Sequence, residues 1–263
     1  MARKSFGQHF LLDLNITRKI ARLADLRPGD AVIEVGPGPG GLTRALVETG
    51  ARVIAVEKDQ RFRPLLEELA AASAGALTLV IGDALKVDEA ALAGGPAHVV
   101  SNLPYNVGTP LLIKWLTGPW TPRSLTLMFQ KEVAARIAAQ PGAEAYGRLA
   151  VIAQATSEAR VVMDVPARAF TPPPKVESAV VRLTPRADRP SAQRLDALQT
   201  VTAAAFGQRR KMLRASLKTL AHEGGGGEAL ALAAGLDPQA RAETVDVAGF
   251  LRLADAWLRT RDA

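Results

Sequence analysis

The stretch AVIEVGPGPGG, residues 31–41, decides the fold. Its first five residues are apolar except for one glutamate, which is typical of a buried strand. The glycines that follow allow a tight turn into a helix. Helical stretches then alternate with further β-rich runs, at residues 52–57, 77–81, 98–102 and 124–129. This alternation predicts an α/β fold with a doubly wound parallel sheet.

The second half of the chain changes character. Two strand candidates, residues 160–165 and 178–183, lie too close for a crossover helix, so we expect an antiparallel pair. The segment TPRADRPSA, residues 184–192, is typical of a linker. Helical stretches fill the rest, at residues 194–206, 209–222, 228–235 and 247–259. We therefore expect an α/β domain at residues 1–187 and a small all-helical domain at residues 188–263.

Composition excludes several classes of protein. The chain has no cysteine, which excludes disulfides, thiolate catalysis and Cys-ligated zinc. Its three histidines, His9, His98 and His222, show no metal-ligand spacing, so we expect no metal. No apolar run reaches the roughly 20 residues of a membrane helix, and we expect a cytoplasmic protein without a membrane partner. The net charge of +7 favours a polyanionic partner.

The glycine loop predicts a ligand site without identifying the ligand. Gly36, Gly38 and Gly41 satisfy G-x-G-x-x-G, which a nicotinamide dehydrogenase would also show. Glu57 ends the second strand, where either a dinucleotide or S-adenosylmethionine would present ribose hydroxyls. A tight turn without any ligand is the third alternative.

A second carboxylate favours S-adenosylmethionine. Asp83 follows the third strand, so it is expected at the same edge of the sheet as Glu57. There it would accept a hydrogen bond from the adenine amine of that cofactor. An aspartate in this position is also a common helix cap, and that alternative stays open.

The most specific short motif is Asn102-Leu103-Pro104-Tyr105, at the end of the fourth strand. An exocyclic adenine amine is a poor nucleophile because its lone pair is delocalised into the ring. The Asn102 side-chain oxygen and the Leu103 carbonyl could accept its two N–H groups and favour a tetrahedral nitrogen. Pro104 restricts the backbone between them and Tyr105, whose ring offers a stacking face for an extruded base. The alternative is an ordinary turn with a packed tyrosine.

With these motifs the chain resembles the ribosomal RNA small-subunit adenine dimethyltransferase family (the dimethyladenosine transferases). Seven segments carry the resemblance in order: GQHFL (7–11), EVGPG (34–38), NLPYN (102–106), QKEV (130–133), YGRL (146–149), FTPPPKV (170–176) and FGQRRK (206–211). They span nearly the whole chain.

The resemblance implies a Rossmann-like methyltransferase domain, a helical C-terminal domain that binds rRNA, and S-adenosylmethionine as methyl donor. The implied substrate is two adjacent adenosines in the 3′-terminal hairpin loop of small-subunit (16S) rRNA, each methylated twice at N6. Free rRNA or an immature small subunit is the implied partner, with a role in subunit biogenesis. We also expect a monomer.

The same resemblance implies roles for individual residues. Cofactor contacts are expected at His9, Leu11, Gly36, Glu57, Asp83 and Asn102. Phe170 is expected to stack on the target adenine opposite Tyr105, although a phenylalanine before a proline run could equally be a core residue. His9 could equally be an ordinary surface histidine.

The C-terminal half carries a basic segment without interleaved acidic residues. It comprises Arg209, Arg210, Lys211, Arg214 and Lys218. The last three lie at i, i+3 and i+7, which would place them on one face of a helix. Contact with RNA phosphates is favoured over a merely solvated face.

Three hypotheses about function remain. The first is the small-subunit rRNA dimethyltransferase, and the second is a large-subunit rRNA adenine dimethyltransferase, which the basic segment disfavours. The third is a ribosome-assembly factor that binds immature subunits and methylates only secondarily. A dehydrogenase is disfavoured because Asn-Leu-Pro-Tyr has no place in hydride transfer.

Overall fold

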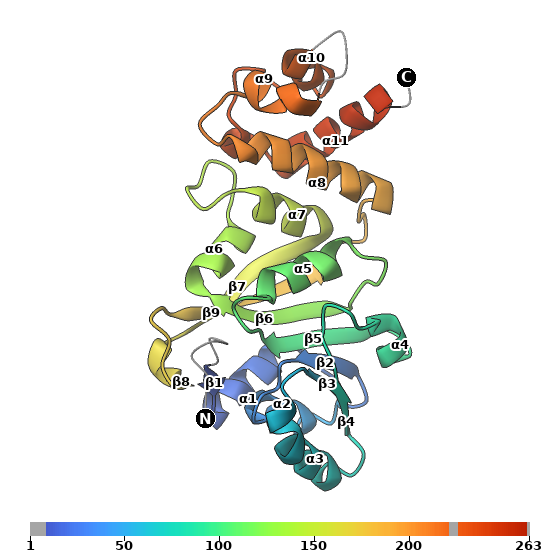
Figure 1. The fold of residues 1–263 in the computed structure, drawn as a ribbon, viewed down its shortest axis with the longest axis vertical. Coiled ribbons are helices and arrows are strands. Elements are labelled where there is room, and N and C mark those ends of the chain that lie inside the picture. The colour runs from blue at the N-terminus through green and yellow to red at the C-terminus, as the bar shows by residue number, and fades with distance from the viewer. Residues whose placement is uncertain (1–8, 221–225, 262–263) are drawn as a thin grey trace. The chain divides into compact units, whose positions relative to one another are not determined.

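The computed structural model describes residues 9–220 and 226–261, which include a seven-stranded sheet (Figure 1). The strand order is β4-β3-β2-β5-β6-β9-β7. The strands are β2 (Ala31–Val35), β3 (Arg52–Glu57), β4 (Leu77–Ile81), β5 (Ala97–Asn102), β6 (Ser124–Gln130), β7 (Ser157–Val165) and β9 (Ser178–Pro185). Strands β2 to β6 pair in parallel, and β9 runs antiparallel to β6. The expected α/β class with a parallel sheet is confirmed.

The sheet places its ligand-binding edge between β2 and β5. Strand β2 is buried along its whole length and pairs with β3 on one side and β5 on the other. The strand order reverses at this point, because β3 and β4 follow β2 in the chain but lie on the side away from β5. In open α/β sheets, ligands bind outside the carboxyl ends of the strands at such a reversal. The glycine loop follows β2 at this edge, and Asn102 is the last residue of β5.

Short helices connect these strands in the first half of the chain. They are α1 (Leu14–Leu23), α2 (Gly41–Val47), α3 (Arg63–Ala72), α4 (Glu89–Ala93) and α5 (Gly108–Thr117). The Asp13 carboxylate caps α1 by accepting from the Asn15 and Ile16 amides, which satisfies two free N–H groups of the first turn.

A small second sheet was not expected from the sequence. Strand β1 (Phe10–Leu11) pairs antiparallel with β8 (Phe170–Thr171), so Leu11 lies opposite Phe170. Two residues are too few for a period-2 pattern, and this pairing between distant segments leaves no local signal. It fixes the segment that precedes α1 beside the loop that follows β7.

The chain divides into two compact units. The first contains residues 9–115, 120–134 and 159–185. The second contains residues 116–119, 135–158, 186–220 and 226–261. The second unit is helical, with α7 (Arg148–Thr156), α8 (Ala192–Gly207), α9 (Leu213–Ser216), α10 (Gly226–Ala233) and α11 (Val247–Arg261). Helix α6 (Lys131–Ala138) spans the division at residue 134.

Helix α7 belongs to the helical unit, although the sequence placed it in the first domain. It packs against α8 and α11. Tyr146, just before it, is buried and donates its hydroxyl to the Val245 carbonyl at 2.9 Å. A contact of this kind joins residues 99 positions apart, which helical periodicity alone cannot predict.

One predicted helix was wrong in its extent. We expected a helix over residues 209–222, but α8 ends at Gly207 and α9 begins only at Leu213. The backbone between them turns away because the amides of Leu213 and Arg214 donate to Ala240 and Pro238. Lys211 therefore does not share a helix face with Arg214. Residues 221 and 222 of the predicted helix lie outside the described residues.

Candidate active site

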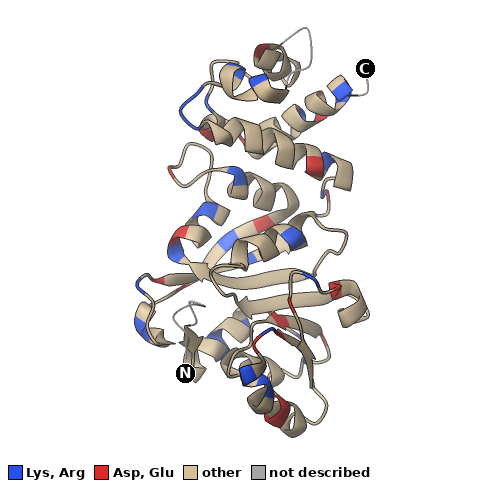
Figure 2. Cartoon of the chain, in the orientation of Figure 1, with Lys and Arg blue, Asp and Glu red and all other residues tan. Residues whose placement is uncertain are grey.

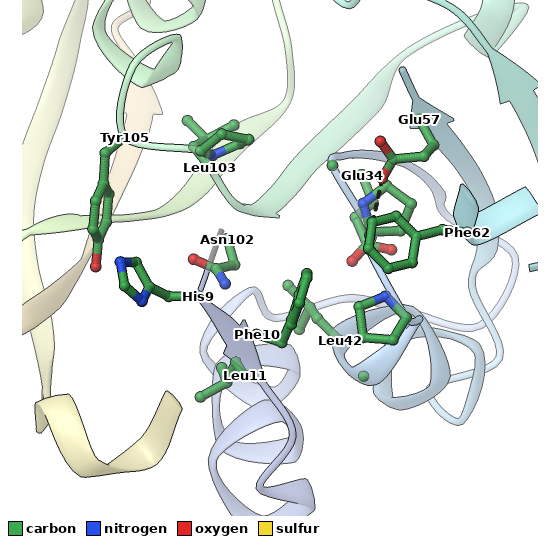
Figure 3. A pocket seen from close by; sticks show the side chains of 16 residues that line it. His9, Phe10, Leu11, Glu34, Leu42, Glu57, Phe62, Asn102, Leu103 and Tyr105 are labelled. Atoms are coloured by element: carbon green, nitrogen blue, oxygen red, sulfur yellow. Dashed lines mark hydrogen bonds between the residues drawn. The ribbon is translucent and has the colours of Figure 1, made fainter. Parts of the chain in front are cut away.

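A pocket lies at the β2–β5 edge of the first unit, and most of the predicted site residues line it (Figure 3). Those residues are His9, Leu11, Gly36, Gly38, Glu57, Asn102, Leu103, Pro104 and Tyr105. They come from four separate segments of sequence. The structure thus brings the glycine loop, the ribose-binding candidate and the Asn-Leu-Pro-Tyr turn to one cavity.

The glycines of the loop serve two different purposes. Gly36 and Gly38 adopt left-handed backbone conformations, with φ of 68° and 56°, which a residue with a Cβ rarely adopts. Gly41 has a different requirement, because a Cβ there would lie 2.4 Å from the Leu11 carbonyl oxygen. The third glycine of the motif therefore admits strand β1 beside the loop rather than a ligand.

Glu57 is buried and braces the glycine loop. Its two carboxylate oxygens accept from the Gly38 amide at 3.0 Å and from the Asp59 amide at 2.7 Å. Burial raises the pKa of Glu57, and these backbone hydrogen bonds oppose the rise. Each carboxylate oxygen has a further lone pair, so the group can still accept from ribose hydroxyls.

Glu34 is a pocket residue that the sequence analysis did not assign. It lies within β2, is only 1% exposed, and lines the pocket. Burial raises the pKa of Glu34 to about 8, the Thr43 hydroxyl partly opposes this, and the charge of Glu57 adds to it. Within the described residues, Glu34 Oε2 has no hydrogen-bond partner. A carboxylate inside an otherwise apolar strand was the available signal.

The unpaired Glu34 Oε2 atom allows us to ask whether the pocket fits S-adenosylmethionine. An unpaired buried acceptor costs free energy unless a ligand supplies a donor or a positive charge. The cofactor carries an ammonium group, whose positive charge would lower the pKa of Glu34 and favour a carboxylate that accepts from it. Its ribose hydroxyls would suit Glu57. The polar groups of the pocket therefore fit this cofactor.

Tyr105 is held by two contacts. Its hydroxyl lies 2.9 Å from Ser178 Oγ, and its ring centroid lies 5.8 Å from that of His9. His9 is in turn hydrogen-bonded through Nδ1 to the Pro172 carbonyl oxygen at 2.8 Å. Burial raises the pKa of Tyr105, so the phenol stays neutral near pH 7. Ser178 and Pro172 were not predicted as site residues, because neither contact leaves a pattern in the sequence.

Two predicted site residues do not line the pocket. Asp83 forms an ion pair with Lys58 at 2.8 Å, which lowers the pKa of Asp83, and it accepts from the Leu85 amide. Asp83 thus caps a turn and not a helix, because α4 begins only at Glu89 and has Asp88 as its N-cap. Its contact with the cofactor stays a prediction. Phe170 is 2% exposed and packs in the apolar core together with Leu11. The core alternative describes its position here, and its stacking role stays a prediction.

The basic segment is exposed on the helical unit (Figure 2). Arg209 is tied down by an ion pair with Glu243 at 3.2 Å and a hydrogen bond to the Glu144 carbonyl. The remaining four cations have no ion-pair partner in the described part of the chain. They are Arg210, Lys211, Arg214 and Lys218. Their charges remain available to an anionic partner.

The described ranges, 9–220 and 226–261, contain no group of three His, Asp or Glu side chains arranged to hold a metal ion. His222 lies outside them. None of the helices in these ranges has the length and hydropathy required to span a bilayer.

Known proteins resemble the chain over nearly all of its length. The family model described as "Ribosomal RNA adenine dimethylase" matches residues 1–257. A protein of Phenylobacterium zucineum named "Ribosomal RNA small subunit methyltransferase A" is 80% identical, over 100% of this chain and 90% of its own length. The protein of that name from Caulobacter vibrioides is 71% identical, over 100% of both chains.

Solved structures agree with these relatives. A dimethyladenosine transferase from Plasmodium falciparum superposes with a TM-score of 0.80 at 26% identity, covering 93% of this chain and 96% of that one. The 23S rRNA methyltransferase ErmE gives a TM-score of 0.71 at 29% identity, covering 94% and 98%. The Rossmann-like methyltransferase fold is thereby confirmed, and the chain belongs to the ribosomal RNA adenine dimethylase family.

Proposed function

We propose that this chain, by family an S-adenosylmethionine-dependent rRNA adenine dimethyltransferase, acts on two adjacent adenosines in the 3′-terminal hairpin loop of small-subunit rRNA. Each adenosine receives two methyl groups at N6. The observation that carries the proposal is that Asn102 and Tyr105 line the same pocket as the glycine loop and Glu57. Amine acceptors and a stacking ring thereby adjoin the cofactor-binding residues.

The bound cofactor supplies an electrophilic methyl group on a sulfonium. The chain's residues hold that cofactor: the left-handed glycines let the backbone approach it, Glu57 accepts from its ribose, and Glu34 from its ammonium. Leu11 of strand β1 and His9, which precedes this strand, also line the pocket.

The remaining residues prepare the adenine amine. The Asn102 side-chain oxygen and the Leu103 carbonyl accept its two N–H groups, which releases the nitrogen lone pair towards the methyl group. With the amine held in this way, its nitrogen would be placed to accept the methyl group that the bound cofactor would supply, and the N6 proton would be lost to water. Tyr105 stacks on the extruded base, an interaction typically worth ~1–3 kcal/mol.

The helical unit anchors the RNA in this proposal. Arg210, Lys211, Arg214 and Lys218 are exposed cations that suit phosphate contact and carry no sequence information. An immature small subunit presents both the hairpin loop and surrounding RNA, and we expect it to be the substrate that binds best. We expect the chain to act as a cytoplasmic monomer and to contribute to subunit assembly.

The large-subunit alternative is favoured by one observation, the similarity to the 23S rRNA methyltransferase. That similarity is 29% identity, against 71% and 80% for the proteins named for the small subunit. Purified small and large subunits that lack the modification should be incubated with methyl-labelled cofactor, and the labelled nucleosides mapped. We expect dimethyladenosine at adjacent positions of small-subunit rRNA. Label confined to large-subunit rRNA would overturn the proposal.

A further inference from the structure

Ser178 places a hydroxyl against the ring that the proposed function assigns to base stacking. It begins strand β9 and is 0% exposed, and its backbone lies in register with Gln130 of β6. The sheet therefore fixes the position of its Cα, and χ1 is the one torsion that sets where the hydroxyl oxygen lies. Its Oγ lies 2.9 Å from the Tyr105 hydroxyl oxygen, which is a hydrogen-bond distance. Either hydroxyl can be the donor.

Tyr105 itself stands on a less constrained segment. It follows the end of β5 at Asn102, and the turn that carries it is closed by the Val107 and Gly108 amides, which both donate to the Pro104 carbonyl. Those bonds fix the backbone of the turn but do not prevent the tyrosine side chain from swinging about χ1. The Ser178 contact acts on the hydroxyl, which such a swing would move furthest, so it opposes the swing.

We propose that Ser178 is a positioning residue for methyl transfer: through the Tyr105 hydroxyl it holds the tyrosine ring in the orientation that receives the target adenine. This rests on the proposed function, in which Tyr105 is the stacking residue. Tyr105 lines the pocket, and Figure 3 shows its ring beside His9, to the left of Asn102. A ring that swings away from this position would leave the amine misaligned with Asn102.

The hydroxyl of Tyr105 thus has a task that the ring face alone does not explain. If only the ring face mattered, Tyr105→Phe would be nearly harmless. With the Ser178 contact in place, we expect Tyr105→Phe and Ser178→Ala each to lower the single-turnover rate about five- to tenfold, the size of one hydrogen bond. The two variants should be equivalent, because each removes the same bond.

A double-mutant cycle tests this directly. Single-turnover methylation of small subunits is measured for the wild type, Ser178→Ala, Tyr105→Phe and the double variant. If the bond carries the effect, the double variant is no slower than either single one. Independent structural damage would instead multiply the two losses, to about 25- to 100-fold, and would overturn the proposal. An unchanged rate in Ser178→Ala would also overturn it.

A matched control separates positioning from loss of a buried hydroxyl. Ser124 begins strand β6, is similarly buried, and is bonded to His98 Nδ1 at 2.8 Å outside the pocket. Ser124→Ala should melt at a lower temperature but keep the wild-type rate. In Ser178→Ala the melting shift caused by S-adenosylmethionine should persist, because Ser178 does not line the pocket.

Failure of the proposed function would look different. It would appear in the wild type, as methyl transfer to another RNA or to none. The cycle would then be measured on the RNA that the wild type does methylate. If the wild type methylates none, fluorescence of 2-aminopurine in place of the target adenine reports stacking. Equal and non-additive losses of stacking support the role of Ser178, and additive losses refute it.

Discussion

Glu34 should make the stability of this protein depend on pH in a direction opposite to that of most carboxylates. Its pKa is about 8 in the folded chain, against 4.5 for an unperturbed glutamate, and burial is the main cause. A difference of this size corresponds to about 5 kcal/mol between the two protonation states. The folded chain therefore binds a proton that the unfolded chain has released.

The sign follows from which state holds more protons. Between pH 4.5 and about 8 the folded state holds more protons at this site, so the free energy of unfolding falls as pH rises. The contribution of Glu34 is fully present below pH 4.5 and is lost by about pH 8. Within the window the slope from this one group approaches about 1.4 kcal/mol per pH unit.

Glu34→Gln removes the titration while keeping the shape of the side chain. We expect the difference in unfolding free energy, variant minus wild type, to rise with pH by about 1.4 kcal/mol per unit between roughly pH 5.5 and 7.5. Urea unfolding at a series of pH values measures it. Glu67→Gln is the control, because Glu67 is exposed and pairs with Arg63 on the surface of α3. Parallel curves for wild type and Glu34→Gln would refute the reasoning.

Three further predictions concern the cofactor, the RNA and the chemistry. S-adenosylmethionine should raise the melting temperature and NAD should not. Glu57→Ala should weaken this rise, because alanine accepts from neither ribose hydroxyl. A rise with NAD alone would contradict the prediction. Replacing Arg210, Lys211 and Arg214 with alanine should lower the affinity for the subunit and reduce the slope of log affinity against log salt by about 2. Cofactor binding should stay intact. An unchanged slope would mean that the segment is only a solvated charged surface. Asn102→Ala should slow single-turnover transfer by about 10²–10³ and leave RNA binding intact, because it removes an acceptor that tightens in the transition state; full activity would place the chemistry elsewhere.

Much of the fold was predictable because it rests on local periodicity. The buried strand at residues 31–35 and its parallel partners follow from short apolar runs that alternate with helical stretches. The pocket followed as well, because loops that leave parallel strands at their carboxyl ends meet at one edge of the sheet. That rule brought Gly36, Glu57 and Asn102 together without any knowledge of their contacts.

Asp83 leaves a strand at the same edge but does not line the pocket. It pairs with Lys58 and accepts from the Leu85 amide, and its contact with the cofactor stays a prediction. The edge of a sheet is wider than one ligand site. The sequence does not indicate how far the loop after β4, which carries Asp83, lies from the loops that form the pocket. Only the side-chain partners distinguish the two outcomes.

The contacts that the sequence could not predict all join distant segments. Gly41 counts as the last glycine of a ligand-binding motif by spacing, but what requires a glycine there is the carbonyl of Leu11, 30 residues earlier. Ser178 lies 73 residues from Tyr105, and no periodicity connects them. Such contacts depend on register: once β9 pairs with β6 with Ser178 opposite Gln130, the Ser178 hydroxyl lies within hydrogen-bond distance of the Tyr105 hydroxyl. A one-residue slip would send its side chain to the other face of the sheet. The precision of the catalytic turn therefore depends on strand pairing far from it in sequence, and this is why substitutions that shift β9 should impair Tyr105 before they impair the cofactor pocket.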